Sequence, residues 1–408
     1  MTSMVDRFSR VAALRPIRAA ESTPIRSQNF EQLMRLLEAE AVLNRLGAHT
    51  RLQVRFPQPK AADFCSRALH LIAPELEDSV CDSTRWLFLD TETTGLAGGT
   101  GTYAFLVGLA WWDGDAFVVE QHFMGDHSEE PSLLLEIADR LAGRRVLVTF
   151  NGKSFDWPLL KTRFQMSRMR DFPEPAAHLD LLYPARQLWR LSLGSVALTQ
   201  LERHVLGFDR GPDIPSQTIP QRYFDFLRGG PSEPIAEIFR HNQMDLCGLA
   251  WLSLRISEIL RDPEQSECCA GELFGISRML QRRGDRHSAG RIYRKALGRG
   301  LPEEAAQVAQ RELAFLAKRN REYALSNELW EKLLGDTVVG FRAYEQLAMY
   351  YEHQADHPEK AVELSREALL KLQGAVQSGH ISSSKFQQLH AKFHHRLSRL
   401  IKVNPNKR

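Results

Sequence analysis

Trp86-Leu87-Phe88-Leu89-Asp90-Thr91-Glu92-Thr93-Thr94-Gly95-Leu96 is the stretch of sequence that decides the fold. It begins as an apolar run, which is typical of a buried strand, and ends in a polar Thr-Thr-Gly turn. Residues two apart share one face of a strand, so Asp90 and Glu92 are expected side by side at its end. Two carboxylates that close repel each other unless a cation lies between them. A hard divalent metal, which prefers oxygen ligands, is the simplest such cation.

The segments that follow predict a mixed sheet flanked by helices. After the first strand, over 85–91, the sequence predicts strands over 102–112, 116–123 and 146–150, and Asp113-Gly114 is a hairpin signal between two of them. Helical patterns follow Asp156 and recur along the chain, at about 133–141, 183–206, 217–228 and 232–260. Three sequential strands followed by alternating helix and strand indicate an α/β domain, which we expect over 84–262.

The N-terminal part of the chain is less regular. Residues 1–28 are rich in Arg, Ala, Ser and Pro, which predicts a disordered, basic N-terminus. Apolar residues at helical spacing predict a helix over 29–46 that ends at Gly47, and alternation over 51–56 predicts a short strand. We expect 29–83 to form an accessory segment that leads into the α/β domain.

Beyond about residue 266 only helical patterns remain. Segments that begin at Ala289, Ser326 and Ala361 carry small residues at helical spacing, so the pattern recurs after 37 and then 35 residues. Each segment follows an apolar helix and a polar turn, and a helix-turn-helix unit of about 34 residues is the tetratricopeptide pattern. We therefore expect tetratricopeptide-like repeats over 266–375, with an unrelated helical bundle as the alternative. Residues 376–408 predict a basic amphipathic C-terminal helix and tail that cap the repeats.

Composition and charge exclude some classes of protein. The 408 residues are 43% hydrophobic and 25% charged, which suits two or three globular domains. Net charge is only +3, but both ends of the chain are basic, which suits either a polyanion or solvated tails. Five cysteines without paired C-x-x-C spacing predict no zinc site or disulfide framework, hence a reducing cytoplasm. Because no apolar run reaches the ~18 residues that cross a bilayer, we expect no membrane partner.

Two later segments could complete a metal site. Asp156 follows the strand over 146–150 and begins a helix, where an Asp taken alone is more often an N-cap. His241 and Asp245 are four residues apart in a helix and share a face, a pair that is usually structural when it stands alone. Together with Asp90 and Glu92, however, they form a set of four carboxylates and one histidine.

This set resembles the motifs of the DEDD superfamily of 3′–5′ exonucleases, also called DnaQ-like, whose fold is ribonuclease H-like. Asp90-Thr91-Glu92 resembles the D-x-E motif, Asn151 to Asp156 resembles N-x3-F-D, and His241 to Asp245 resembles H-x3-D of the histidine subtype. The likeness covers about 85–260. Other segments are similar to bacterial YprB-type ribonuclease H-like proteins, which carry tetratricopeptide repeats after the nuclease domain: 101–109, 178–182, Asp213-Ile214-Pro215 and Ile219-Pro220.

The resemblance implies a hydrolase that acts on DNA or RNA from a 3′ end. Asp90, Glu92, Asp156 and Asp245 would hold two Mg²⁺ or Mn²⁺ ions that clamp the scissile phosphate. His241 would be the general base that takes the proton of the attacking water, a task suited to imidazole because it titrates near neutrality. The helical repeats would bind a protein partner or guide the substrate.

Residues beside the motifs are candidates for nucleic-acid contacts, with packing or solvated surface as the alternative for each. The candidates are Thr93, Thr94 and Leu96 near the terminal nucleotide, and Asn151, Lys153, Phe155 and Arg163 along the strand. Two other functions stay open. The chain could be a non-catalytic adaptor that works through its repeats, or a structure-specific endonuclease on the same fold.

Overall fold

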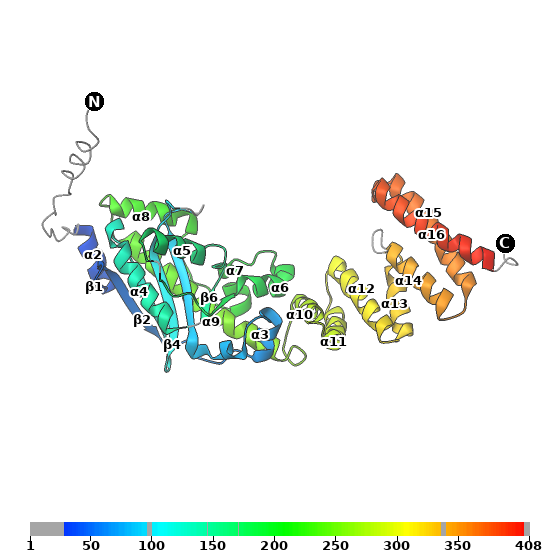
Figure 1. The fold of residues 1–408 in the computed structure, drawn as a ribbon, viewed down its shortest axis with the longest axis horizontal. Coiled ribbons are helices and arrows are strands. Elements are labelled where there is room, and N and C mark those ends of the chain that lie inside the picture. Colours follow the sequence, from blue (N-terminus) through cyan, green and yellow to red (C-terminus); the bar gives the residue numbers. More distant parts are fainter. Residues whose placement is uncertain (1–27, 96–99, 145, 170, 336–339, 404–408) are drawn as a thin grey trace, which may run out of the picture.

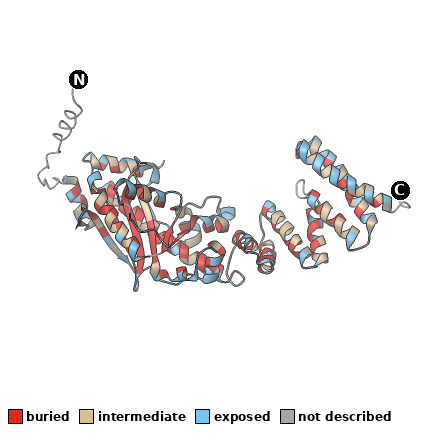
Figure 2. Ribbon diagram, in the orientation of Figure 1, coloured by how far each residue is buried: buried red, intermediate tan, exposed pale blue. Residues whose placement is uncertain are grey.

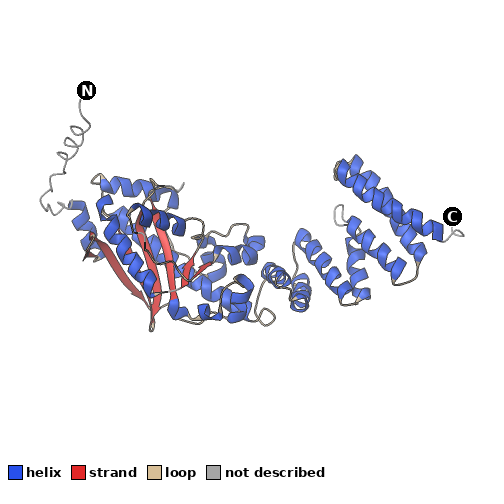
Figure 3. Ribbon diagram, viewed as in Figure 1, coloured by secondary structure: helices blue, strands red, loops and turns tan. Residues whose placement is uncertain are grey.

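The computed structural model describes residues 28–95, 100–144, 146–169, 171–335 and 340–403. Nearly all of the basic N-terminus over 1–28, Leu96 and the end of the C-terminal tail lie outside these described residues. A domain that contains the sheet lies at one end of the molecule, and a row of helices extends from it (Figure 1). The strands all lie in the first part (Figure 3). This arrangement confirms the predicted fold class, an α/β domain followed by an all-helical region.

Seven strands form one mixed sheet in the order β1-β2-β5-β4-β3-β6-β7. The central strand β3 pairs antiparallel with β4 and parallel with β6, and β7 adds parallel to β6. At the opposite edge of the sheet, β2 pairs with β5, and β1 pairs with β2 in a hairpin. The segment before the predicted α/β domain therefore contributes two strands to the sheet of that domain. The strands are β1 (Glu40–Asn44), β2 (Gly47–Phe56), β3 (Trp86–Thr93), β4 (Ala104–Asp113), β5 (Ala116–Phe123), β6 (Val146–Thr149) and β7 (Ala177–Asp180).

The prediction of a helix over 29–46 is wrong in its second half. Helix α2 covers only Gln28–Leu37, Glu38 adopts a positive φ of 53°, and strand β1 then begins at Glu40. Phe30 and Leu33 are buried and explain why the helical pattern starts there. Leu43 in β1 is 82% exposed, so this strand is specified by backbone pairing with β2 and not by a buried face.

Side chains alternate across β3 and fill both faces of the sheet. Trp86 and Phe88 point into one hydrophobic cluster, and Leu87 and Leu89 point into the other. Figure 2 shows these strands as the most continuously buried part of the domain. The helices of this part are α2 (Gln28–Leu37), α3 (Ser66–Ile72), α4 (Glu130–Gly143), α5 (Asp156–Met166), α6 (Leu182–Leu193), α7 (Leu198–Leu201), α8 (Ile219–Leu227) and α9 (Glu233–Arg261).

The helical region is built from consecutive antiparallel pairs. Residues in the left-handed conformation occupy the turns of three pairs: Gly284 with φ 82°, Arg321 with φ 65° and Asp356 with φ 52°. Each lies five residues before one of the small residues that mark the repeat, and all three of those, Ala289, Ser326 and Ala361, are buried. The helices are α10 (Ala270–Arg282), α11 (Arg286–Gly298), α12 (Glu303–Arg319), α13 (Tyr323–Leu333), α14 (Gly340–His353), α15 (Pro358–Gln377) and α16 (Ser383–Val403).

The two parts of the molecule share a continuous core. One hydrophobic cluster runs from the sheet through α6 into α10, α11 and α12. Helix α10 approaches α6 closely at Gly275, where an added Cβ would lie 2.1 Å from the carbonyl oxygen of Gln187. The Trp189 indole also donates a hydrogen bond of 2.7 Å to Glu272. Across the described stretches of chain, no helix combines the length and apolar character needed to cross a membrane.

Candidate metal centre

The C-terminal half of β3 meets helix α9 at a glycine. Asp90 pairs in register with Gly108 of β4, and an added Cβ there would lie 2.2 Å from Oδ1 of Asn242 and 2.7 Å from Leu246. The absence of a side chain at Gly108 therefore lets α9 approach the sheet. Asn242 donates a hydrogen bond of 2.7 Å to Oδ2 of Asp90, which fixes the register of the helix against the strand.

This approach brings the third sequence motif to the first. Ligand atoms of Glu92, His241 and Asp245 all lie within 4.8 Å of one another, a spacing that could hold a metal ion. His241 Nε2 lies 3.4 Å from Oδ2 of Asp245 and 4.0 Å from Oε1 of Glu92. Glu92 and His241 are 8% and 6% exposed, so these groups are largely removed from water.

Asp156 reaches the same cluster from α5. The hydroxyl of Thr91, between the two acids of β3, donates a hydrogen bond of 2.5 Å to Oδ1 of Asp156. Phe155, not Asp156, occupies the N-cap position of α5. The preceding turn is held by buried Asp180, whose carboxylate accepts the backbone N–H groups of Asn151 and Lys153 at 2.8 and 3.0 Å.

The electrostatics of the cluster favour a bound cation. Burial raises the pKa of Asp90 and Glu92 well above their usual range, and repulsion from Asp245 and the other carboxylates raises it further. Burial also raises the pKa of Asp156 to about 6, despite the hydrogen bond from Thr91 that lowers it. Crowded, desolvated carboxylate oxygens are the donor set that Mg²⁺ and Mn²⁺ prefer, so these residues fit such ions.

One guanidinium compensates part of this charge. Arg210 donates a hydrogen bond of 2.5 Å to Oδ1 of Asp245. It donates another of 2.6 Å to Glu202, which begins the short π-helical segment Glu202–Leu206, and its Nη1 lies 3.3 Å from the carboxylate of Asp213. The Arg210 side chain is 5% exposed and that of Glu202 is 1% exposed. The sequence prediction missed Arg210, because nothing in its local pattern indicates that it meets Asp245.

Asp213 orients the histidine. Its Oδ1 lies 2.8 Å from Nδ1 of His241. Because an ionised carboxylate only accepts, this contact assigns the proton to Nδ1 and leaves Nε2 directed at the carboxylate cluster. The sequence drew attention to Asp213 through its likeness to one family, but indicated no role for it.

The predicted nucleic-acid contacts are only partly gathered at the cluster. Thr93 and Thr94 lie at the end of β3, where the Thr93 hydroxyl donates to Gly95 and that of Thr94 accepts the N–H of Tyr103. Phe155, 57% exposed, and the exposed Lys153 flank the turn before Asp156, as does Asn151, whose φ is 70°.

Arg163 lies elsewhere and is 3% exposed. Its guanidinium makes two hydrogen bonds with Glu130, of 2.5 and 2.6 Å, and stacks 3.8 Å above the ring of Tyr103. This contact network leaves Arg163 unavailable to a phosphate, so its predicted role is not supported.

A cavity of about 260 Å³ adjoins the outer side of His241. Its wall includes Asp213, Arg222, Arg240 and Met244. Arg222 is paired with Glu237, whereas Arg240 is exposed and has no carboxylate partner within the described part of the chain. The cavity therefore offers a cation beside the histidine.

Comparison with known proteins assigns the class. A family model described as RNase_H superfamily matches residues 87–256, the stretch that supplies β3, α5 and α9. The chain thus contains a ribonuclease H-like domain. It is 30% identical over 286 residues to the uncharacterized protein YprB of Bacillus subtilis (strain 168), across 69% of this chain and 68% of that protein. The chain belongs to the YprB family.

A solved structure is similar at a much lower level. The family B DNA polymerase of the archaeon Pyrobaculum calidifontis aligns with a TM-score of 0.34 and 14% identity. The alignment covers 48% of this chain but only 29% of the polymerase, so this chain spans less than a third of that protein.

Proposed function

We propose that this protein is a metal-dependent 3′–5′ exonuclease of the DEDD type. The observation that carries the proposal is the meeting of Asp90, Glu92, Asp156, His241 and Asp245, from three distant segments, in one partly buried, acidic cluster. A ribonuclease H-like domain supplies the nuclease class. The histidine and its spacing to Asp245 support the exonuclease subtype.

Asp90, Glu92, Asp156 and Asp245 are the residues that would hold two Mg²⁺ or Mn²⁺ ions. Bound ions of this kind polarise a phosphodiester and lower the pKa of water. The protein's own part is to accept the proton: Nε2 of His241, freed by the Asp213 contact at Nδ1, takes it from the attacking water. The new P–O bond forms as the bond to the 3′ oxygen breaks, and a nucleoside monophosphate leaves.

The terminal nucleotide would lie across the end of β3 and the turn before α5. Thr93 and Thr94 offer hydroxyl and backbone groups there, and Asn151 lies beside Asp156. Phe155 is an exposed ring on which a base can stack, and the exposed Lys153 and Arg240 can approach phosphates. Leu96, which was predicted to lie near the terminal nucleotide, lies outside the described residues.

The helical region completes the proposal as a tetratricopeptide-like array over 266–375. Equivalent left-handed turns before Ala289, Ser326 and Ala361 support a repeated unit and argue against an irregular bundle. The array would guide substrate or bind a protein partner, and 376–408 would cap it. We place the protein in the cytoplasm because its five cysteines are free.

A digestion series tests the proposal. The protein with Mn²⁺ is incubated with linear single-stranded DNA and RNA, labelled at either end, and with closed circles of the same sequence. We expect the 3′ label to be released first as mononucleotide and the circles to stay intact. Cleavage of the circles would replace the exonuclease with an endonuclease. Failure to cut any substrate would leave the adaptor function in its place.

A further inference from the structure

A groove lies at the junction of the ribonuclease H-like domain and the first helices of the helical region. Its volume is about 550 Å³, and its lining includes Leu191 of α6, Phe274, Arg278 and Arg282 of α10, Tyr293 of α11 and Arg311 of α12. It differs from the metal centre in composition, because aromatic, aliphatic and arginine side chains line it.

Three arginines and two glutamates line the groove, and Glu304, like two of the arginines, forms no ion pair among the described residues. Arg278 and Arg282 are exposed, one turn apart on α10, and neither forms an ion pair with a carboxylate among the described residues. Arg282 donates 3.0 Å to the side-chain oxygen of Gln187, and Arg278 lies 5.8 Å from the centre of the Phe274 ring. The acids of the lining are Glu304 and Glu312, of which Glu312 is paired with Arg311 at 2.8 Å.

The aromatic residues of the lining, Tyr293 and Phe274, are buried. Burial raises the pKa of Tyr293 and nearby Glu312 raises it further, while the positive charges of Arg278, Arg311 and Arg282 oppose the shift. Exposed guanidinium groups beside a groove are the kind of contact that the phosphates of single-stranded nucleic acid make with a protein.

Helix α6 connects this groove to the metal centre. The carboxylate of Asp180, which holds the turn before Asp156, also accepts the N–H of Leu182 at the start of α6. The helix has 12 residues, so it is about 18 Å long. Gln187, the partner of Arg282, lies in its middle. The groove therefore lies within about one length of α6, roughly 18 Å, of the turn before Asp156.

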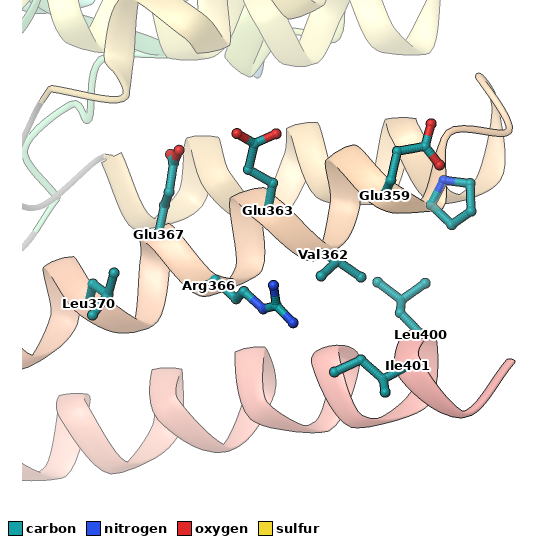
Figure 4. A pocket seen from close by; sticks show the side chains of 9 residues that line it. Glu359, Val362, Glu363, Arg366, Glu367, Leu370, Leu400 and Ile401 are labelled. Carbon is teal, nitrogen blue, oxygen red and sulfur yellow. The ribbon is translucent and has the colours of Figure 1, made fainter. Parts of the chain in front are cut away.

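We propose that this groove binds the single strand upstream of the 3′ end that lies at the metal centre. The inference rests on the proposed exonuclease function and adds a second contact for the same strand. A groove at the far end, between α15 and α16, is lined by three glutamates of α15, Glu359, Glu363 and Glu367, and by Arg366, which points toward α16 (Figure 4). Glutamates outnumber arginines in that lining, so it suits phosphates less well than the groove at α10 does.

Direct binding tests the groove independently of catalysis. The Arg278→Gln/Arg282→Gln variant is compared with wild type and with Arg319→Gln/Arg366→Gln, which removes the same charge from exposed residues of α12 and α15 outside the groove. In EDTA, fluorescence anisotropy with labelled oligo-dT and oligo-U of about 30 nucleotides should show about tenfold weaker binding only for the groove variant. Its slope of log K against log salt should fall by about 1.4, because each phosphate contact to a single strand contributes about 0.7.

Digestion in Mn²⁺ separates the two proposals. The groove variant should have a raised KM for an oligonucleotide of about 30 nucleotides, whereas kcat/KM for one of about three, too short to reach the groove, should match wild type. Wild type that digests neither length would refute the exonuclease function. Equal binding by all three proteins, or an equal loss in both variants, would refute the groove. If the groove variant binds oligonucleotides like wild type but no longer binds polyglutamate, the groove is a site for an acidic protein instead.

Discussion

At the scale of single residues, the metal centre is defined by an imbalance of charge. The described residues bring several carboxylates together with Arg210 as their close cationic partner, and Asp245 uses only one of its oxygens for that contact. The oxygen that remains faces His241. A divalent cation would reduce the repulsion that raises the pKa of Asp90 and Glu92, and this supports the metal-binding role that we propose.

The hydrogen bond between Asp213 and His241 predicts a positioning role for Asp213. An Asp213→Ala variant removes the acceptor that holds the proton on Nδ1 of His241. The proton can then lie on Nε2, where it blocks the attacking water, so kcat should fall about 10–100-fold, the cost of losing an outer partner of a functional histidine. KM and Mn²⁺ affinity should change little, because Asp213 is not among the expected ligands. Steady-state kinetics and Mn²⁺ calorimetry measure the two effects. A normal kcat would show that His241 needs no such partner, and Asp213→Glu should restore part of the rate.

At the scale of elements, the sequence predicts best those segments whose side chains are buried on a regular period. Strands β3 and β6 are apolar runs, and α9 carries a helical pattern, so their existence was predicted. Strand β1 was mistaken for helix because its pairing with β2 depends on backbone hydrogen bonds. Strand β7 has only four residues and was not predicted.

A buried network that joins β2, β5 and α4 predicts a pH dependence of stability. His49 Nε2 lies 2.9 Å from His122, whose other ring nitrogen lies 3.0 Å from Glu120, and Arg140 donates to the same carboxylate at 2.7 Å. Burial lowers the pKa of His49 from 6.5 to about 3. Burial alone would raise the pKa of Glu120, but hydrogen bonds from His122 and Arg140 lower it from 4.5 to about 2.

Both shifts make stability fall in acid. As pH falls below 6.5, the unfolded chain binds a proton at His49 while the folded protein does not. The free energy of unfolding therefore keeps the full contribution of His49 above pH 6.5 and loses it progressively toward pH 3. The contribution of Glu120 is complete above pH 4.5 and declines toward pH 2.

The His49→Gln variant isolates the histidine contribution. The free energy of unfolding of wild type should decline by about 2 kcal/mol more than that of the variant between pH 6.5 and 4.5, since each pH unit below the unfolded pKa contributes about 1.4 kcal/mol. Urea titrations at several pH values measure this difference. The exposed His70→Gln control should follow wild type. Parallel curves for His49→Gln and wild type would show that folding does not lower the pKa of His49.

At the scale of the whole molecule, sequence motifs identified the residues of the centre but not everything that surrounds them. Asp90, Asp156 and Asp245 have local patterns that resemble a family, so they could be predicted. Arg210 and Asp213 lie in an irregular segment more than thirty residues before Asp245, and only the fold brings them to it. The same holds for the groove of Arg278 and Arg282, which exists because α10 packs against α6.

The most direct test of the central claim is hydrolysis by an Asp90→Asn variant in Mn²⁺. Asparagine preserves size and can still meet Asn242, but it removes the charge that a metal ion needs. The release of 3′-terminal mononucleotide from a linear single strand should fall at least about a hundredfold, since loss of an outer partner alone costs about 10–100-fold. The matched Asp113→Asn control, whose side chain is 58% exposed in the β4–β5 hairpin, should retain the wild-type rate. Equal rates for Asp90→Asn and wild type would contradict the assignment of this cluster as the catalytic metal centre.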